Sequence, residues 1–182
     1  PQSISIVADR RLGKSSLLYH VYSRYRNVLR NPDEYLFCHL DLQEKEKYPS
    51  RERFYEEIMK SANLSYSTSV DYSVFEEGLK TVKENKKKLV LLLDEFDVLV
   101  NDERFDSGFL GNLRSLAPTY DIGYITASQR PLNDICHNEA KGSPFFNIFH
   151  RLDLGVFKPD EAEEMLFTLS ERGGRRFSDE II

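Results

Sequence analysis

Near the start of the chain, one stretch combines small residues with a lysine and a serine side by side. It reads Ala8-Asp9-Arg10-Arg11-Leu12-Gly13-Lys14-Ser15 and continues into Ser16. Small residues at a strand-to-helix turn let backbone N–H groups point inward, where they bind phosphate together with the helix N-terminus. Lys14 would then bridge the β- and γ-phosphates, both as a ligand and in catalysis, and the Ser15 hydroxyl would bind Mg²⁺. Residues 8–16 therefore form a predicted phosphate-binding loop.

An alternative interpretation of this stretch is a plain glycine-containing turn with an exposed lysine. It gains some weight from Ala8, which stands where glycine is usual. A second motif argues against it. The apolar run Leu89-Val90-Leu91-Leu92-Leu93 ends in two adjacent acids, Asp94 and Glu95. Asp94 would hold Mg²⁺ directly or through water, and Glu95 would polarise an attacking water as a general base.

These acids have a simpler interpretation as well, in which they end a buried strand and cap the following helix. The occurrence of both motifs in the expected order, on the expected elements, favours the nucleotide site. Asp97 could orient Glu95 or support the metal, but an ordinary position at a helix N-terminus is an equal alternative.

Two further positions carry weaker signals. Ser128 and Arg130 follow a predicted strand and are candidate sensors of the γ-phosphate, although loops are polar in any case. Arg151 could act on the nucleotide of a neighbouring subunit, and the alternative is a solvated arginine.

The elements that must position these residues alternate along the chain. Apolar stretches predict strands at residues 3–7, 35–42, 89–93, 122–126 and 151–154. Helical spacing predicts helices at 17–29, at 54–62, from a capping box at 73–76 onward, at 109–116 before Pro118, and from Pro159 to Gly173-Gly174. The last helix has an apolar stripe expected to face the core: Ala162, Met165, Leu166 and Leu169. This alternation predicts an open parallel α/β sheet whose ligand chemistry lies at the carboxyl ends of the strands.

Bulk properties exclude several classes of protein. With 182 residues, the chain is long enough for one α/β domain and part of a second element. A net charge of −5 gives no indication of nucleic-acid binding. Cys38 and Cys136 have no metal-ligand spacing, which favours a reducing cytoplasm. Five apolar residues in a row are too few to cross a membrane, and the predicted helix start at Ser178-Asp179-Glu180 suggests an excised piece of a longer protein.

With these motifs in place, the sequence resembles the ASCE division of P-loop ATPases, in particular STAND and archaeal-ATPase-like AAA+ domains. The similarity is carried by Arg10 to Leu18, by Asp94-Glu95-Phe96-Asp97, by Ile125 to Arg130, and by Arg151 to Phe157 ahead of an acidic helix. It implies a three-layer P-loop NTPase fold with a five-stranded parallel sheet in the order 5-1-4-3-2. Residues 1–157 would form this core, and residues 158–182 would begin a helical lid. The resemblance also implies ATP with Mg²⁺, slow hydrolysis, and a nucleotide-controlled switch that often forms homo-oligomers.

Three functions follow as hypotheses. The first is a STAND-like signalling ATPase in which bound triphosphate favours one conformation and hydrolysis resets it. The second is a DNA-directed AAA+ ATPase, such as an initiator or a transposition helper, which would need a basic face or an attached DNA-binding domain. The third is a nucleotide-binding scaffold without hydrolysis, and Glu95 argues against it.

Overall fold

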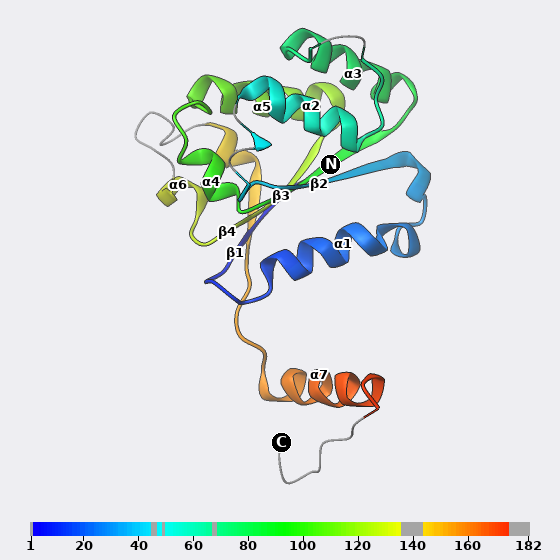
Figure 1. Ribbon diagram of the computed structural model, residues 1–182, viewed down its shortest axis with the longest axis vertical. Helices are drawn as coiled ribbons and strands as arrows, with labels where there is room; N and C mark the ends of the chain where they lie inside the picture. Colours follow the sequence, from blue (N-terminus) through cyan, green and yellow to red (C-terminus); the bar gives the residue numbers. More distant parts are fainter. Residues whose placement is uncertain (1, 45–46, 49, 67–68, 136–143, 175–182) are drawn as a thin grey trace.

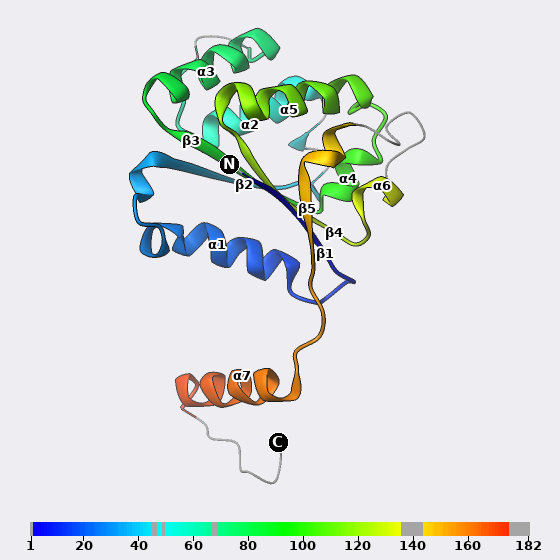
Figure 2. The ribbon, with the colours of Figure 1, turned by 180° about the vertical axis from the view of Figure 1, so that it is seen from behind.

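The computed structural model describes residues 2–44, 47–48, 50–66, 69–135 and 144–174 (Figures 1 and 2). The elements are, in chain order, β1 (Ser3–Val7), α1 (Lys14–Val28), η1 (Pro32–Glu34), β2 (Tyr35–Asp41), α2 (Arg51–Ser61), α3 (Tyr72–Glu84), β3 (Lys88–Asp94), α4 (Phe96–Val100), α5 (Ser107–Tyr120), β4 (Gly123–Ser128), α6 (Leu132–Ile135), η3 (Pro144–Ile148), β5 (Phe149–Asp153) and α7 (Pro159–Arg172).

The five strands form one parallel sheet in the order β2-β3-β4-β1-β5. Read from the other edge, this is the predicted order 5-1-4-3-2, so the predicted fold class is confirmed. The register pairs Val7 with Ser128 and Asp41 with Asp94, which places the ends of these four strands along one edge. Loops that follow these strands must therefore meet at this edge of the sheet.

Helices cover both faces of the sheet, with more on one face than on the other. In Figures 1 and 2, α2, α3 and α5 lie over one face and α1 lies over the other. The side chains of β3 alternate accordingly: Leu91 belongs to the larger core cluster and Leu92 to the smaller one, which α1 enters through Leu18. All three leucines are fully buried, and each such burial is worth about 1.5–3 kcal/mol. The apolar run that predicted β3 is therefore explained by burial on both faces.

Two predicted helix limits are wrong. The cap of α3 is Asp71, whose carboxylate accepts a hydrogen bond from the Val74 N–H, and not Ser73 two residues later. Pro118 does not stop α5, which continues to Tyr120. A proline in a last turn removes only one backbone hydrogen bond. Beyond it, the Tyr120 hydroxyl hydrogen-bonds Glu76 of α3 at 3.0 Å, so tertiary contacts hold the helix past the proline.

The strands β4 and β5 are displaced from their predicted limits: β4 runs to Ser128, and β5 begins at Phe149. Both differences have one cause, since strand limits follow the pairing with β1 and not the local apolar pattern. The predicted helix start at residues 178–180, and Cys136, lie outside the described residues.

Helix α7 stands away from the sheet, on the side of α1 (Figures 1 and 2). It begins at Pro159 and is followed by Gly173, as predicted. Its stripe is not part of the core, because Met165, Leu166 and Leu169 are 38%, 36% and 55% exposed. An amphipathic pattern shows which side of a helix needs a partner, but not which layer supplies it. No helix within the described part of the chain is long and apolar enough to span a bilayer.

Candidate functional site

A hollow of about 640 Å³ lies at the carboxyl ends of the strands. Loops that follow β1, β2, β3 and β4 all contribute to it. Its lining contains seven of the residues predicted from the sequence: Arg10, Arg11, Gly13, Lys14, Ser15, Ser16 and Glu95. Four further residues complete it: Gln43, Asp97, Val98 and Gln129. The lysine-containing loop and the acidic segment after β3 therefore share one cavity.

The loop after β1 is shaped by left-handed backbone at two positions. Arg11 has φ 66° and Gly13 has φ 86°, and Gly13 is the N-cap of α1. An N-cap glycine has no side chain to accept hydrogen bonds from the first-turn N–H groups, which also lack partners within the helix. These groups, at the positive end of a 15-residue helix, are therefore left to an incoming anion.

Lys14 is the buried cation of the hollow, with only 4% of its surface exposed. Its ammonium group donates hydrogen bonds to the carbonyl oxygens of Ala8 at 3.0 Å and Asp9 at 3.1 Å. The alternative interpretation of a turn with an exposed lysine is therefore wrong. Ala8 and Asp9 do not line the hollow themselves, but their carbonyl groups hold the lysine beside it.

The two acids after β3 differ in environment. Asp94 is 4% exposed, and its Oδ1 accepts a hydrogen bond from the Glu95 N–H at 2.9 Å. Glu95 has left-handed backbone, with φ 51° and ψ 45°, and its side chain faces the hollow. It is the N-cap residue of α4 without capping the helix through its carboxylate. The helix-capping interpretation therefore does not account for Glu95.

Burial raises the pKa of Glu95, and the charge of Asp97 adds to this, whereas Lys14 acts in the opposite direction. The Gln129 side chain hydrogen-bonds Glu95. Burial also raises the pKa of Asp97, against a hydrogen bond from its own backbone N–H to the carboxylate and against the charges of Lys14, Arg10 and Arg130. Asp97 lies in the first turn of α4 and lines the hollow as well, so both interpretations of this residue describe its position.

The structure does not place the two sensor candidates in the lining. Ser128 is fully buried, and its hydroxyl donates to the Arg130 carbonyl at 2.8 Å. Their neighbour Gln129 occupies the hollow instead. Gln43 was also missed, since a single polar residue two positions after the end of β2 has no distinctive spacing. Leu12 and Asp94 lie beside the hollow and do not line it. Arg151 is exposed and pairs with Asp153 of its own strand at 2.7 Å.

Comparison with known proteins identifies the family. Residues 1–176 match the family model described as Novel STAND NTPase 2. The chain belongs to this family of STAND NTPases. Among curated proteins, no match is found.

Solved structures share the fold of this STAND NTPase domain. The Aeropyrum pernix ORC2 protein, solved as ADPNP-ADP complexes, superimposes with a TM-score of 0.75 at 14% identity, over 93% of this chain and 46% of the ORC2 chain. Cdc6p from Pyrobaculum aerophilum gives 0.66 at 13% identity over 93% and 43%. AMPPCP-bound DnaA from Aquifex aeolicus gives 0.62 at 14% identity over 98% and 48%. This chain therefore spans less than half the length of each.

The residues of the STAND domain fit a magnesium ion that would be bound partly by the protein and partly by a polyphosphate. Within the described ranges, there is no cluster of three or more histidine, cysteine or acidic side chains that could hold a metal alone. The Ser15 hydroxyl in the hollow and the carboxylate of Asp94, the residue before Glu95, are oxygen donors of the kind Mg²⁺ prefers. Such a pair leaves the remaining coordination positions to phosphate and water.

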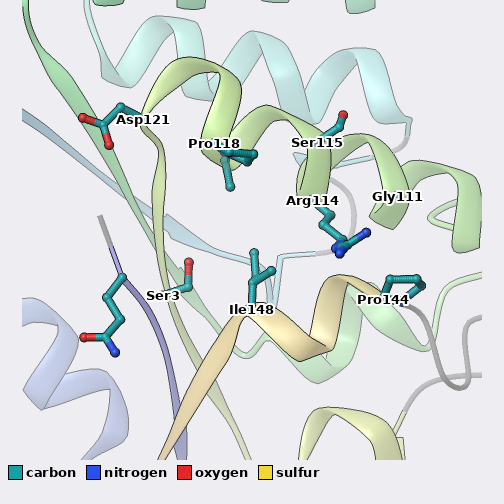
Figure 3. Close-up of a pocket in the computed structure, with 10 residues that line it drawn as sticks. Ser3, Gly111, Arg114, Ser115, Pro118, Asp121, Pro144 and Ile148 are labelled. Atoms are coloured by element: carbon teal, nitrogen blue, oxygen red, sulfur yellow. The ribbon is translucent and has the colours of Figure 1, made fainter.

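A second hollow in the STAND domain, of about 540 Å³, lies at the opposite, amino edge of the sheet (Figure 3). It lies between α5 and the starts of β1 and β5, and Ser3, Arg114, Pro118, Asp121 and Ile148 are among its lining residues. Figure 3 shows Asp121 and Arg114 well apart in it. It lacks the buried lysine and the paired acids of the carboxyl-edge hollow.

Proposed function

We propose that this STAND NTPase domain binds ATP with Mg²⁺ in the carboxyl-edge hollow and hydrolyses it. The observation that carries the proposal is that Lys14 and Glu95 line one cavity together with Gly13, whose backbone is left-handed. Two proteins with the same fold support the choice of nucleotide, since their structures contain ADPNP with ADP and AMPPCP. Adenine is thus preferred over guanine by analogy, while the phosphate chemistry rests on the residues of this chain.

In this proposal, the loop residues 8–16 surround the phosphates. The N–H groups at the start of α1 bind the β-phosphate, and Arg10 and Arg11 add positive charge at the mouth of the hollow. Lys14 exchanges its carbonyl partners for the β- and γ-phosphate oxygens, to which an ammonium group binds more strongly. Ser15 and Asp94 would hold Mg²⁺, which neutralises charge that develops on the phosphates. Ser128 and Arg130 act indirectly. The hydrogen bond from the Ser128 hydroxyl to the Arg130 carbonyl fixes the backbone on either side of Gln129.

Glu95 is the proposed general base. The oxygen of a water molecule forms a bond to the γ-phosphorus, and the bond from this phosphorus to the β–γ bridging oxygen breaks. The electron pair of the broken bond stays with ADP, and the proton of the water passes to the Glu95 carboxylate. A raised pKa suits this role, because a more basic carboxylate accepts a proton more readily.

A nucleotide-controlled switch is the proposed use of this reaction. Residues 1–157 would form the core and residues 158–182 the start of a lid, in keeping with the separation of α7 from the sheet (Figure 1). If the triphosphate and diphosphate bind the two lid arrangements with different affinities, hydrolysis changes their populations. The exposed stripe on α7 supplies a surface that one arrangement can bury. Nucleotide-dependent sedimentation of the protein tests whether this change includes self-association.

Substitution of Glu95 by glutamine tests the hydrolysis proposal. We expect turnover to fall about 10²–10⁴-fold, since the amide cannot take the proton, while affinity for a non-hydrolysable triphosphate stays within about threefold. Glu77→Gln, which changes an exposed glutamate on α3, is the matched control. Hydrolysis by Glu95→Gln at the parent rate would remove Glu95 from the mechanism.

A second candidate function is a DNA-directed ATPase. It is favoured by the fold that the domain shares with the Aeropyrum pernix ORC1 protein, solved in complex with DNA, at a TM-score of 0.64 and 14% identity. Stimulation of ATP turnover by duplex DNA would support this function, and turnover that is insensitive to DNA would favour the signalling switch.

A further inference from the structure

Asp97 presents a buried acceptor atom without a partner to the carboxyl-edge hollow. Its side chain lines the cavity, and its Oδ1 is buried and makes no hydrogen bond. Among the described residues, it is the one carboxylate in this situation. Buried acceptors are paired in most proteins, and an unpaired one at a functional site calls for a partner that arrives with the ligand.

The charges around Asp97 do not supply that partner. Lys14, Arg10 and Arg130 are close enough to favour the charged form of the carboxylate, yet none of them donates a hydrogen bond to Oδ1. The ammonium group of Lys14 is directed to the carbonyl oxygens of Ala8 and Asp9. Asp94 and Glu95, the other acids of this segment, have no proton to donate when ionised. The atom is thus held in a positive field but remains unpaired.

The partner of Oδ1 must reach the end of the hollow where Glu95 lies. The proposed Mg²⁺ has Ser15 and Asp94 as its protein ligands, which leaves a hydrogen-bond donor for Asp97. Phosphate oxygens only accept hydrogen bonds, and two anions repel, so the triphosphate itself is excluded. The hydroxyl and amino groups of a nucleoside are donors, but they lie at the far end of the nucleotide from the γ-phosphate. A water molecule next to the γ-phosphate is the donor that fits.

We propose that Asp97 is a second catalytic acceptor, whose Oδ1 binds one hydrogen of the attacking water while Glu95 binds the other. This inference rests on the proposed ATP hydrolysis. A water molecule has two hydrogens, and when two carboxylates accept both, its lone pair is turned to the remaining direction, toward the γ-phosphorus. Only the hydrogen on Glu95 is transferred. The one on Asp97 stays with the oxygen and leaves with the phosphate.

The test compares two complexes of Asp97→Ala, because only one of them contains the attacking water. ADP with aluminium fluoride and Mg²⁺ mimics the transferring phosphoryl group together with its axial water, whereas a non-hydrolysable triphosphate analogue mimics the substrate alone. We expect the variant to bind the aluminium fluoride complex at least about tenfold more weakly than the parent protein does, with triphosphate affinity unchanged within about twofold. Asp97→Asn retains a carbonyl acceptor and is expected to lose less. Asp33→Ala, an exposed aspartate on η1, is the control.

Two results would overturn the inference. Equal losses for both complexes would assign Asp97 to phosphate binding or to folding, which thermal melting of the variant separates. Unchanged affinity for both would show that the water does not need this acceptor. Failure of the proposed function is distinguishable from these outcomes, because then Lys14→Ala would bind the triphosphate analogue as tightly as the parent protein, and the role of Asp97 would fall with it.

Discussion

The two hollows of the sheet differ little in volume and greatly in chemistry. The carboxyl-edge hollow measures about 640 Å³ and the amino-edge hollow about 540 Å³. Each has a cation, a serine and a glycine in its lining: Lys14, Ser15 and Gly13 in the first, Arg114, Ser115 and Gly111 in the second. A similar volume and a few shared residue types therefore do not make the two hollows equivalent.

The difference lies in how the cation of each hollow is held. Lys14 is buried and hydrogen-bonded, whereas Arg114 is exposed. Left-handed backbone does not separate the two hollows, because Gly13 and Glu95 adopt it at the carboxyl edge and Asp121 adopts it at the amino edge. Gly111 lies within regular helix. The comparison teaches that a buried, hydrogen-bonded lysine, more than cavity size, identifies the reactive edge.

The largest difference is expected for the two cations. Lys14→Ala should weaken binding of an ATP analogue by about 100-fold or more, since a buried charge-assisted partner of the phosphates is lost. Arg114→Ala, at the amino edge, should leave the affinity within about twofold. Calorimetric titration of both variants measures this. A larger loss for Arg114→Ala would reverse our assignment of the two hollows.

Substitutions of the two serines should differ by about one order of magnitude in the gain in nucleotide affinity that Mg²⁺ provides. Ser15→Ala removes a proposed ligand and should reduce the gain in nucleotide affinity from Mg²⁺ about tenfold, in line with the loss of one hydrogen bond or ligand to a charged group. Chelation of Mg²⁺ should abolish the difference between this variant and the parent protein. Ser115→Ala is the control, because its hydroxyl donates to the Asn112 carbonyl on α5. Equal behaviour of the two variants would exclude Ser15 as a metal ligand.

The smallest effect concerns the two glycines, and its sign should differ between them. A Cβ atom at either position meets nothing within 4 Å, so packing does not distinguish them. Gly13→Ala must hold alanine at φ 86°, which should lower the free energy of unfolding by about 1–2 kcal/mol. Gly111→Ala replaces glycine in a helix and should raise it by about 0.5–1 kcal/mol. Urea denaturation measures both free energies of unfolding. Destabilisation by Gly111→Ala would mean that α5 requires glycine at position 111.

Much of the fold could be predicted from the sequence, because its signals are local. The leucine run of β3, the alternation of strands and helices, and Pro159 at the start of α7 each follow from side chains near in sequence. The wrong predictions concern features that are set by contacts with residues distant in the sequence. Pairing with β1 sets the limits of β4, contact with Glu76 carries α5 past Pro118, and the stripe of α7 could not reveal that it is exposed.

The candidate site was predicted in the same way. Loop residues 8–16, Asp94 and Glu95 were predicted from motif spacing, and seven of these residues line the hollow. Gln43 and Gln129 were not predicted, because a polar residue after a strand has no distinctive spacing, and for Asp97 the sequence left a role in the site and a helix N-terminal position as equal alternatives. Ser128 lies in the predicted loop, but its hydroxyl donates to the Arg130 carbonyl, and its neighbour Gln129 lines the cavity.

The sequence by itself determined which chemistry this chain can carry: a lysine and serine at a helix start, two acids at the end of an apolar strand, and a parallel sheet to hold them. Residue type and local backbone preference suffice for that. Only the tertiary structure decided that Lys14 is buried, that Glu95 faces the cavity while Asp94 lies beside it, and that an acceptor of Asp97 is left unpaired. These features depend on how loops from four strands meet, and the energy of such contacts is set by neighbours that are distant in the chain.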